Sequence, residues 1–446
     1  MATEHLIFLS IPGLRPGDVT ASDTPTLFEW ANRGALAVLE PTFPCVTSCV
    51  QASMLTGTPP EAHGVIANGF YNRGPGGPDV AFWVAHNDVV SGESVWDAVR
   101  HRRPDSVSAV WHAQNIKGAT ADFIITPSPI HEADGTTKLW CYSKPDGMYQ
   151  WLLDGMGHFP LQHYWGPFSN IESTRWILNA AARLIEREAP NYHWIYIPHL
   201  DYAAQKFGPN SSQARAALGE LDAALADFAG QVARTPTGGD AVFLVAGEYA
   251  LTDVKGAVFP NRALRRAGLL AVTERDRGEY IDLAGSAAFA MVDHQFAHVY
   301  VDQPQRVEDV VAVLSTIPGI AGVFAGARRR EIGMDHPRSG DVVIVTDDDR
   351  WCAYYWWIDD HLAPPFAHTV DIHNKPGYDP VELFLDAETK RTPLDATLVR
   401  GSHGVAVSKS RHRTALICSS PDAGLDDRRV HRDTDLKSTS LRILGL

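Results

Sequence analysis

The chain has few cysteines, no long apolar run and no excess of positive charge. Its 446 residues include five cysteines without a Cys-x-x-Cys pair, which argues against a disulfide framework and indicates reduced thiols. No apolar stretch approaches the length that crosses a bilayer, and the first residues lack the basic segment of a signal peptide. The sequence therefore predicts a cytoplasmic protein without a membrane span.

The charge balance excludes some partners. A formal net charge of −14 argues against a nucleic acid polymer or an anionic membrane, because both attract patches of Lys and Arg. It does not exclude a small anionic substrate, since a bound metal can reverse the sign of the local field. The hydrophobic content of 45% is sufficient for a large core.

Short apolar runs alternate with helical stretches along most of the chain. Buried strands are predicted at 6–11, 35–39, 193–197 and 241–245, and helices at 25–33, 50–56, 174–188 and 212–233. This order favours an α/β fold with a mostly parallel central sheet covered by helices. We expect one domain over 1–446, with an aromatic-rich insertion over the sheet edge at about 69–170 and a small α/β cap subdomain at about 260–340.

The most informative block runs from Phe43 to Gly69. Within it, Thr47 stands at a loop-to-helix junction, where free backbone N–H groups and the positive helix end suit an anionic phosphoryl group. An isolated threonine before an apolar run more often simply caps the helix. The longer pattern shifts this balance: Pro-x-x-Thr, then Thr-Gly-x-x-Pro-x-x-His-Gly-x-x-x-Asn ending at Asn68.

This pattern resembles the nucleophile segment of the nucleotide pyrophosphatase/phosphodiesterase branch of the alkaline phosphatase superfamily. The resemblance implies that Thr47 attacks phosphorus and that Asn68 hydrogen-bonds a phosphoryl oxygen, while His63 holds the turn. It also implies an alkaline phosphatase-like fold, with metal ions that stabilise the attacking and leaving oxygens.

Three more segments follow in the family's order. Asp201 and Gln205 lie in Asp-x-x-x-Gln-x-x-Gly-Pro, where the family carries Asp-x-x-x-His-x-x-Gly-Pro. Glu248 lies in Gly-Glu-Tyr-Ala, in place of Ser-Asp-His-Gly, and His403 in Ser-His-Gly matches the final family ligand. The resemblance implies metal ligands at Asp201, Glu248 and His403, with Gln205 at a fourth ligand position.

The departures from the family pattern concern the metal site. Pro12 stands where the family has an Asp ligand, and Gln205 and Tyr249 stand where it has histidines. We therefore expect the metal position that activates Thr47 to be empty or greatly weakened. An unassisted threonine hydroxyl is a poor nucleophile at neutral pH, so something else must lower its pKa.

The chain offers spare ligands and cations. Asp371 and His373 are two residues apart, so on a strand they would face the same side as two metal ligands could. Further Asp and His residues gather at 293–298 and 335–336, and we expect at least one of these three clusters to contribute to the site. Arg338 and Lys375 are candidates for holding a substrate phosphate.

Together these features predict a metal-dependent hydrolase of phosphate esters, a phosphodiesterase or nucleotide pyrophosphatase with a threonine nucleophile and a small phosphorylated substrate. The expected cofactor is a divalent metal, zinc or alternatively manganese, as one ion or two. Two alternatives stay open: a catalytically silent ligand-binding protein on the same fold, and an enzyme acting on another phosphorus bond such as C–P. Retention of both Thr47 and Asn68 favours an enzyme, although a phosphate-binding protein could also keep them.

Overall fold

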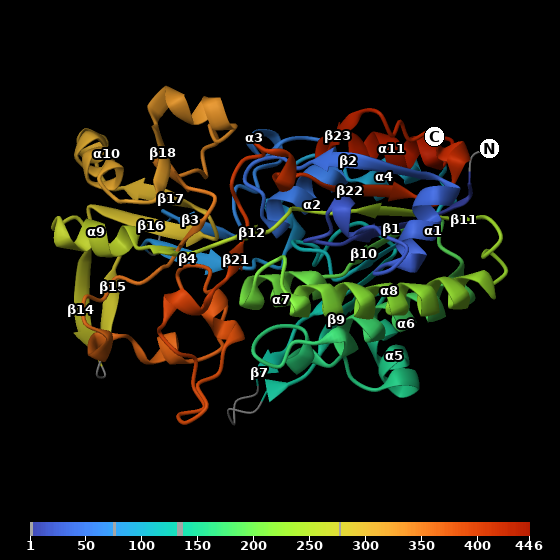
Figure 1. Ribbon diagram of the computed structural model, residues 1–446, viewed down its shortest axis with the longest axis horizontal. Helices are drawn as coiled ribbons and strands as arrows, with labels where there is room; N and C mark the ends of the chain where they lie inside the picture. The colour runs from blue at the N-terminus through green and yellow to red at the C-terminus, as the bar shows by residue number, and fades with distance from the viewer. Residues whose placement is uncertain (1–2, 75–76, 132–136, 276–277) are drawn as a thin grey trace.

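The computed structural model describes residues 3–74, 77–131, 137–275 and 278–446. Figure 1 shows a larger lobe around one sheet and a smaller lobe around a second sheet. No helix within the described ranges is both long and apolar enough to cross a membrane.

The larger lobe is built on a nine-stranded sheet in the order β23-β2-β22-β11-β1-β10-β5-β6-β9. Its strands are β1 (His5–Ser10), β2 (Ala35–Glu40), β5 (Ser108–Trp111), β6 (Phe123–Pro127), β9 (Cys141–Lys144), β10 (Tyr192–Tyr196), β11 (Ala241–Ala246), β22 (Thr414–Cys418) and β23 (Val430–Arg432). The run from β11 through β1, β10 and β5 to β6 is parallel, whereas β22 and β9 are antiparallel to their neighbours. The predicted mostly parallel sheet is confirmed.

Helices cover both faces of this sheet (Figure 1). One face packs against α1 (Pro25–Arg33), α6 (Ile171–Glu188) and α8 (Ser212–Ala233), and the other against α2 (Thr47–Thr56), α4 (Val95–Arg102) and α11 (Leu436–Ile443). Strand β1 shows why: Ile7 and Leu9 join the first core, while Leu6 and Phe8 join the second. Alternate residues of a strand point to opposite faces, so an uninterrupted apolar run becomes buried on both sides.

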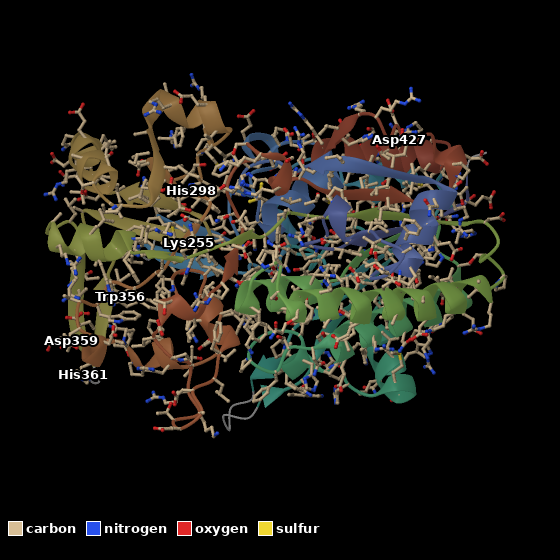
Figure 2. The ribbon with its side chains drawn as sticks, in the orientation of Figure 1. Lys255, His298, Trp356, Asp359, His361 and Asp427 are labelled. Atoms are coloured by element: carbon tan, nitrogen blue, oxygen red, sulfur yellow. The ribbon has the colours of Figure 1, made fainter. Side chains whose placement is uncertain are left out.

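The smaller lobe has a four-stranded antiparallel sheet in the order β16-β17-β19-β18. It comprises β16 (Ala288–Asp293), β17 (Phe296–Val301), β18 (Ile320–Ala325) and β19 (Val342–Thr346), with α9 (Pro260–Arg266) and α10 (Val307–Ser315). Figure 2 shows His298 and Trp356 within this lobe, and both are buried there. The β16–β17 hairpin turns at His294, which has a left-handed φ of 56°, uncommon for a residue other than glycine.

The remaining α-helices and strands each have nine residues or fewer. They are α3 (Pro60–His63), α5 (Met148–Met156), α7 (His199–Phe207), β3 (Gly69–Asn72), β4 (Asp79–Phe82), β7 (Ile130–His131), β8 (Thr137–Lys138), β12 (Thr252–Asp253), β13 (Gly256–Val258), β14 (Ala271–Arg275), β15 (Gly278–Asp282), β20 (Arg350–Cys352) and β21 (Gly401–Ser402).

Three local expectations differ from the structure. The stretch 69–170, expected to lie over the sheet edge, supplies β5, β6 and β9 to the central sheet, because strands of four or five residues between Gly- and Pro-rich loops give little periodic signal. Helix α2 begins at Thr47 rather than at residue 50. Asp371 and His373 lie in a turn rather than on a strand, since Asn374 Nδ2 donates to Asp371 Oδ2 at 2.6 Å and closes a local turn.

The buried side chain of His193 should make the stability of the central sheet depend on pH. It lies on β10, is 1% exposed, and neither ring nitrogen has a hydrogen-bond partner in the described ranges. Burial lowers the pKa of His193 to about 3. The unfolded imidazole takes a proton below about pH 6.5, so the stability present above that pH is lost as the pH falls toward 3.

We therefore predict that His193→Leu gains stability relative to the wild type between pH 8 and pH 5, by about 2 kcal/mol. Urea unfolding of both proteins at the two pH values measures this difference. The matched control is His361→Leu, the same substitution at an exposed position on the lower left edge of the smaller lobe in Figure 2. An equal stability difference at both pH values for His193→Leu would contradict the prediction.

Candidate active site

Thr47 is the first residue of α2 and is 3% exposed. The residue before it, Val46, is the N-cap and makes no side-chain cap bond. The Thr47 hydroxyl is instead 3.0 Å from the phenol oxygen of Tyr249, which follows β11. Thr47 is therefore not a capping residue, and its hydroxyl faces the carboxyl-terminal edge of the central sheet.

Asn68 links the start of α2 to the smaller lobe. Its Oδ1 accepts a hydrogen bond from the backbone N–H of Ser48 at 3.0 Å. Its own backbone N–H and Nδ2 donate to the two carboxylate oxygens of Asp293, at 2.7 and 3.1 Å. Burial raises the pKa of Asp293 to about 7, and the Asn68 hydrogen bonds oppose that rise. The 293–298 cluster thus reaches the site through the β16–β17 hairpin.

Asp201 lies in the first turn of α7 and is 5% exposed. Gln205 lies one turn later on the same face and donates from Nε2 to Asp201 Oδ2 at 2.9 Å. The Tyr249 phenol donates to the same oxygen at 3.4 Å. Burial raises the pKa of Asp201 to about 7, against the lowering effect of both hydrogen bonds.

Glu248 follows β11 and is completely buried. Its Oε1 accepts hydrogen bonds from Ser10 Oγ at 2.6 Å and from Gln51 Nε2 at 2.7 Å. Its Oε2 has no partner in the ranges described. Burial raises the pKa of Glu248 to about 8, so a large share of this carboxyl is protonated at neutral pH.

His403 belongs to a stack of four buried rings. Tyr249 lies against one face of the imidazole with centroids 3.6 Å apart, and His294 lies against the other at 3.7 Å. Tyr378 in turn stacks on His294 at 3.6 Å. His403 Nδ1 is 2.7 Å from the carbonyl oxygen of Cys45, so Nδ1 carries the hydrogen and Nε2 is the free acceptor.

Besides Glu248 Oε2, two atoms of this cluster have no partner in the described part of the chain, Asp201 Oδ1 and His403 Nε2. They lie 3.9 Å apart. Six predicted residues therefore gather in one buried region at the ends of β10 and β11: Thr47, Asn68, Asp201, Gln205, Glu248 and His403.

The other four candidates lie in different surroundings. His373 is exposed and Asp371 is half-buried in its turn. Arg338 donates from Nη1 to the backbone carbonyl oxygens of Gly64 and Val89, at 2.9 and 2.5 Å. Lys375 is 1% exposed and lies 2.8 Å from both Asp379 and Glu382. The structure therefore engages both cations in contacts within the protein.

Sequence reasoning missed three tyrosines next to the cluster: Tyr164, Tyr196 and Tyr202. Tyr196 ends β10 and Tyr202 directly follows Asp201, and these two are 6% and 9% exposed. Burial raises the pKa of Tyr196 well above its usual value, as do the nearby Tyr249 and Glu248. These phenols stay neutral and can donate hydrogen bonds to a bound group.

The metal pair implied by the resemblance does not fit these side chains. Among the described residues, no group of three or more His, Cys, Asp and Glu side chains is arranged to hold a metal ion. A catalytic zinc usually takes three protein ligands, whereas only Asp201 Oδ1 and His403 Nε2 face each other unpartnered. Pro12, Gln205 and Tyr249 occupy three of the other family positions. Glu248 occupies a fourth, with its Oε1 hydrogen-bonded to Ser10 and Gln51.

Comparison with known proteins places this chain in a family. The family model of type I phosphodiesterase/nucleotide pyrophosphatase matches residues 6–379. An uncharacterized pyrophosphatase/phosphodiesterase of Schizosaccharomyces pombe is 22% identical over 228 residues, which are 50% of this chain and 40% of that protein. The chain thus spans less than half the length of this relative.

Two solved structures share the fold. Phosphonoacetate hydrolase from Sinorhizobium meliloti 1021 superposes with a TM-score of 0.66 at 16% identity, covering 99% of this chain and 96% of that one. Murine ectonucleotide pyrophosphatase/phosphodiesterase 5 gives 0.63 at 14% identity, covering 99% and 95%. The resemblance inferred from the motifs is confirmed: this chain belongs to the type I phosphodiesterase/nucleotide pyrophosphatase family.

Proposed function

We propose that this chain hydrolyses a small phosphoric ester, with Thr47 as the nucleophile. The observation that carries the proposal is the Thr47 hydroxyl, which starts α2 without capping it and is hydrogen-bonded to Tyr249 at 3.0 Å. Membership of a phosphodiesterase and pyrophosphatase family supports the reaction class.

The chain of hydrogen bonds from Thr47 offers a path for its proton. As Thr47 Oγ1 bonds to phosphorus, its proton passes to the Tyr249 oxygen, and the Tyr249 proton passes to Asp201 Oδ2. Burial raises the pKa of the Tyr249 phenol well above its usual value, so the phenol relays a proton rather than ionising. The leaving oxygen takes its proton from a water molecule, and the resulting hydroxide cleaves the phosphothreonine. Thr47 then regains its proton from Asp201 through Tyr249.

Asn68 is the proposed partner of a phosphoryl oxygen. One hydrogen of its Nδ2 is held by Asp293, and an amide nitrogen carries a second donor hydrogen. The contact from Ser48 fixes the amide beside the start of α2. Helix α2 adds its positive end to the same place.

The ligand is proposed to be small. One solved relative holds phosphonoacetate and another holds AMP, and we carry over only the presence of a phosphorus group. The phenols of Tyr164, Tyr196 and Tyr202 would hydrogen-bond the remainder of such a ligand. Because phosphonoacetate contains a C–P bond, hydrolysis of a C–P bond is the nearest alternative reaction.

A catalytically silent binding protein is the second candidate, and burial favours it. Thr47, Asn68 and Asp201 are each no more than 5% exposed. A substrate therefore reaches them only if the residues that cover them move.

An activity assay distinguishes ester hydrolysis, C–P cleavage and binding without turnover. The purified protein is given bis(4-nitrophenyl) phosphate, 4-nitrophenyl phosphate or phosphonoacetate. We expect turnover of an ester, measured as released nitrophenol. Turnover of phosphonoacetate alone would shift the reaction to the C–P bond. Binding of phosphate without turnover of any of the three would leave the silent protein as the answer.

Tyr249→Phe should lower kcat on the turned-over ester by about 10²-fold or more, a typical contribution of positioned proton transfer. The phenyl ring keeps the stack on His403, so the melting temperature should change little. Tyr354→Phe is the matched control, because that buried hydroxyl has no hydrogen-bond partner within the described chain. Unchanged kcat in Tyr249→Phe would remove the relay from the mechanism.

A further inference from the structure

The Tyr249 phenol lies between Thr47 and Asp201, where a metal ion would be expected to bind both side chains. Its oxygen is 3.0 Å from Thr47 Oγ1 and 3.4 Å from Asp201 Oδ2. A single phenol can accept from one partner and donate to the other. The space between Thr47 and Asp201 is therefore filled by a neutral group that satisfies both.

Gln205, like Tyr249, uses its polar atoms in hydrogen bonds within the protein. Its Nε2 donates to Asp201 Oδ2 at 2.9 Å, and its Oε1 accepts from the Tyr378 phenol at 2.7 Å. Both ends of the amide are used, and Asp201 Oδ2 now has two neutral donors. A carboxylate oxygen with two hydrogen bonds does not need a cation to satisfy its lone pairs.

The two unpartnered atoms stand farther apart than two ligands of a tetrahedral metal. Bonds of about 2.0–2.1 Å at tetrahedral angles hold two ligand atoms about 3.3 Å apart. Asp201 Oδ1 and His403 Nε2 lie 3.9 Å apart, and the His403 ring is fixed between Tyr249 and His294 at 3.6 and 3.7 Å. Closing the gap would disturb this stack.

The end of β1 holds Tyr249 in place. The backbone N–H of Gly13 donates to the carbonyl oxygen of Tyr249 at 2.8 Å. Gly13 has a φ of 86°, a conformation that glycine adopts at little cost. Pro12, which supplies no ligand, thus belongs to a loop that positions the residue filling the gap.

We propose that Tyr249 and Gln205 replace the metal ions of this site, so that the protein keeps its catalytic cluster assembled without binding a divalent metal. The proposal concerns the same cluster as the proposed function, but it depends on metal binding and stability rather than on turnover. It therefore holds or fails whether or not the protein hydrolyses an ester.

The wild-type protein should contain far less than one equivalent of zinc or manganese after expression with added metal and dialysis. Its melting temperature should be the same in EDTA and in zinc. Elemental analysis and thermal unfolding measure both quantities. A full equivalent of metal, together with a lower melting temperature in EDTA, would overturn the proposal.

The double variant Tyr249→His/Gln205→His tests the cause. It adds two imidazoles beside Asp201 and His403, so we expect about one equivalent of zinc per chain and a melting temperature that falls in EDTA. Adding His403→Asn should abolish that binding. If the folded double variant bound no zinc, the two replacements would not be what excludes the metal; if it failed to fold, the wild-type measurements would decide.

Discussion

Thr47→Ala should lower kcat for ester hydrolysis by about 10⁴-fold or more, the scale seen when a covalent nucleophile is removed. The Thr47 hydroxyl is the one that touches Tyr249. The neighbouring Ser48 uses its backbone N–H to fix Asn68, so it is poorly placed to take over the attack. Steady-state kinetics on the turned-over ester, with kcat and KM determined separately, give the result.

Thr47→Ser is the matched control for this substitution. It keeps a hydroxyl at the start of α2, so it should retain part of the activity, while both variants should melt close to the wild type. Binding of inorganic phosphate to Thr47→Ala, followed by calorimetry, adds an independent measurement. If Thr47→Ala turned over the ester like the wild type, Thr47 could not be the nucleophile, whatever the phosphate affinity.

Strand ends explain why the sequence could predict much of the candidate site. Asp201 and Glu248 follow β10 and β11, which lie on either side of β1 in the sheet. Parallel neighbours bring their carboxyl ends to one edge, so motifs spread over two hundred residues converge. The mostly parallel sheet is predicted separately, from the alternation of short apolar runs and helical stretches.

Contacts across the fold explain what the sequence could not predict. It showed Tyr249 and Gln205 as departures from the family pattern, but not that the phenol reaches Thr47 or that the amide reaches Tyr378. These contacts join residues about two hundred positions apart and depend on side-chain directions. The place of Asp293 against Asn68 likewise depends on how the smaller lobe sits on the larger one.

Lys375 illustrates a different limit of prediction from the sequence. Its charge indicated a residue that binds a substrate phosphate, but its neighbours are two acidic side chains. Its Nζ lies 2.8 Å from Asp379 Oδ2 and 2.8 Å from Glu382 Oε1. Burial alone would lower the pKa of Lys375, but the charges of the two carboxylates raise it. The lysine is therefore held as a cation inside the protein.

The buried ion pairs of Lys375 also hold in place the aromatic residues that form a wall of the candidate site, Trp165, Tyr202 and Tyr378. Glu382 Oε2 accepts a hydrogen bond from Trp165 Nε1 at 2.8 Å. The Trp165 ring packs against Tyr202 and Tyr378, with centroids 5.6 and 5.8 Å apart. Loss of the lysine should therefore loosen Trp165 and Tyr378 as well as lower stability.

Lys375→Met should lower the free energy of unfolding by about 3–5 kcal/mol, the cost of leaving a buried charge without its partner. Urea unfolding at pH 7, followed by tryptophan fluorescence, measures the loss. The triple variant Lys375→Met/Asp379→Asn/Glu382→Gln removes all three charges and should recover much of the loss, because neutral groups cost far less to bury. A loss below about 1 kcal/mol in Lys375→Met would mean that water reaches the carboxylates, and that the ion pair does not hold this wall together.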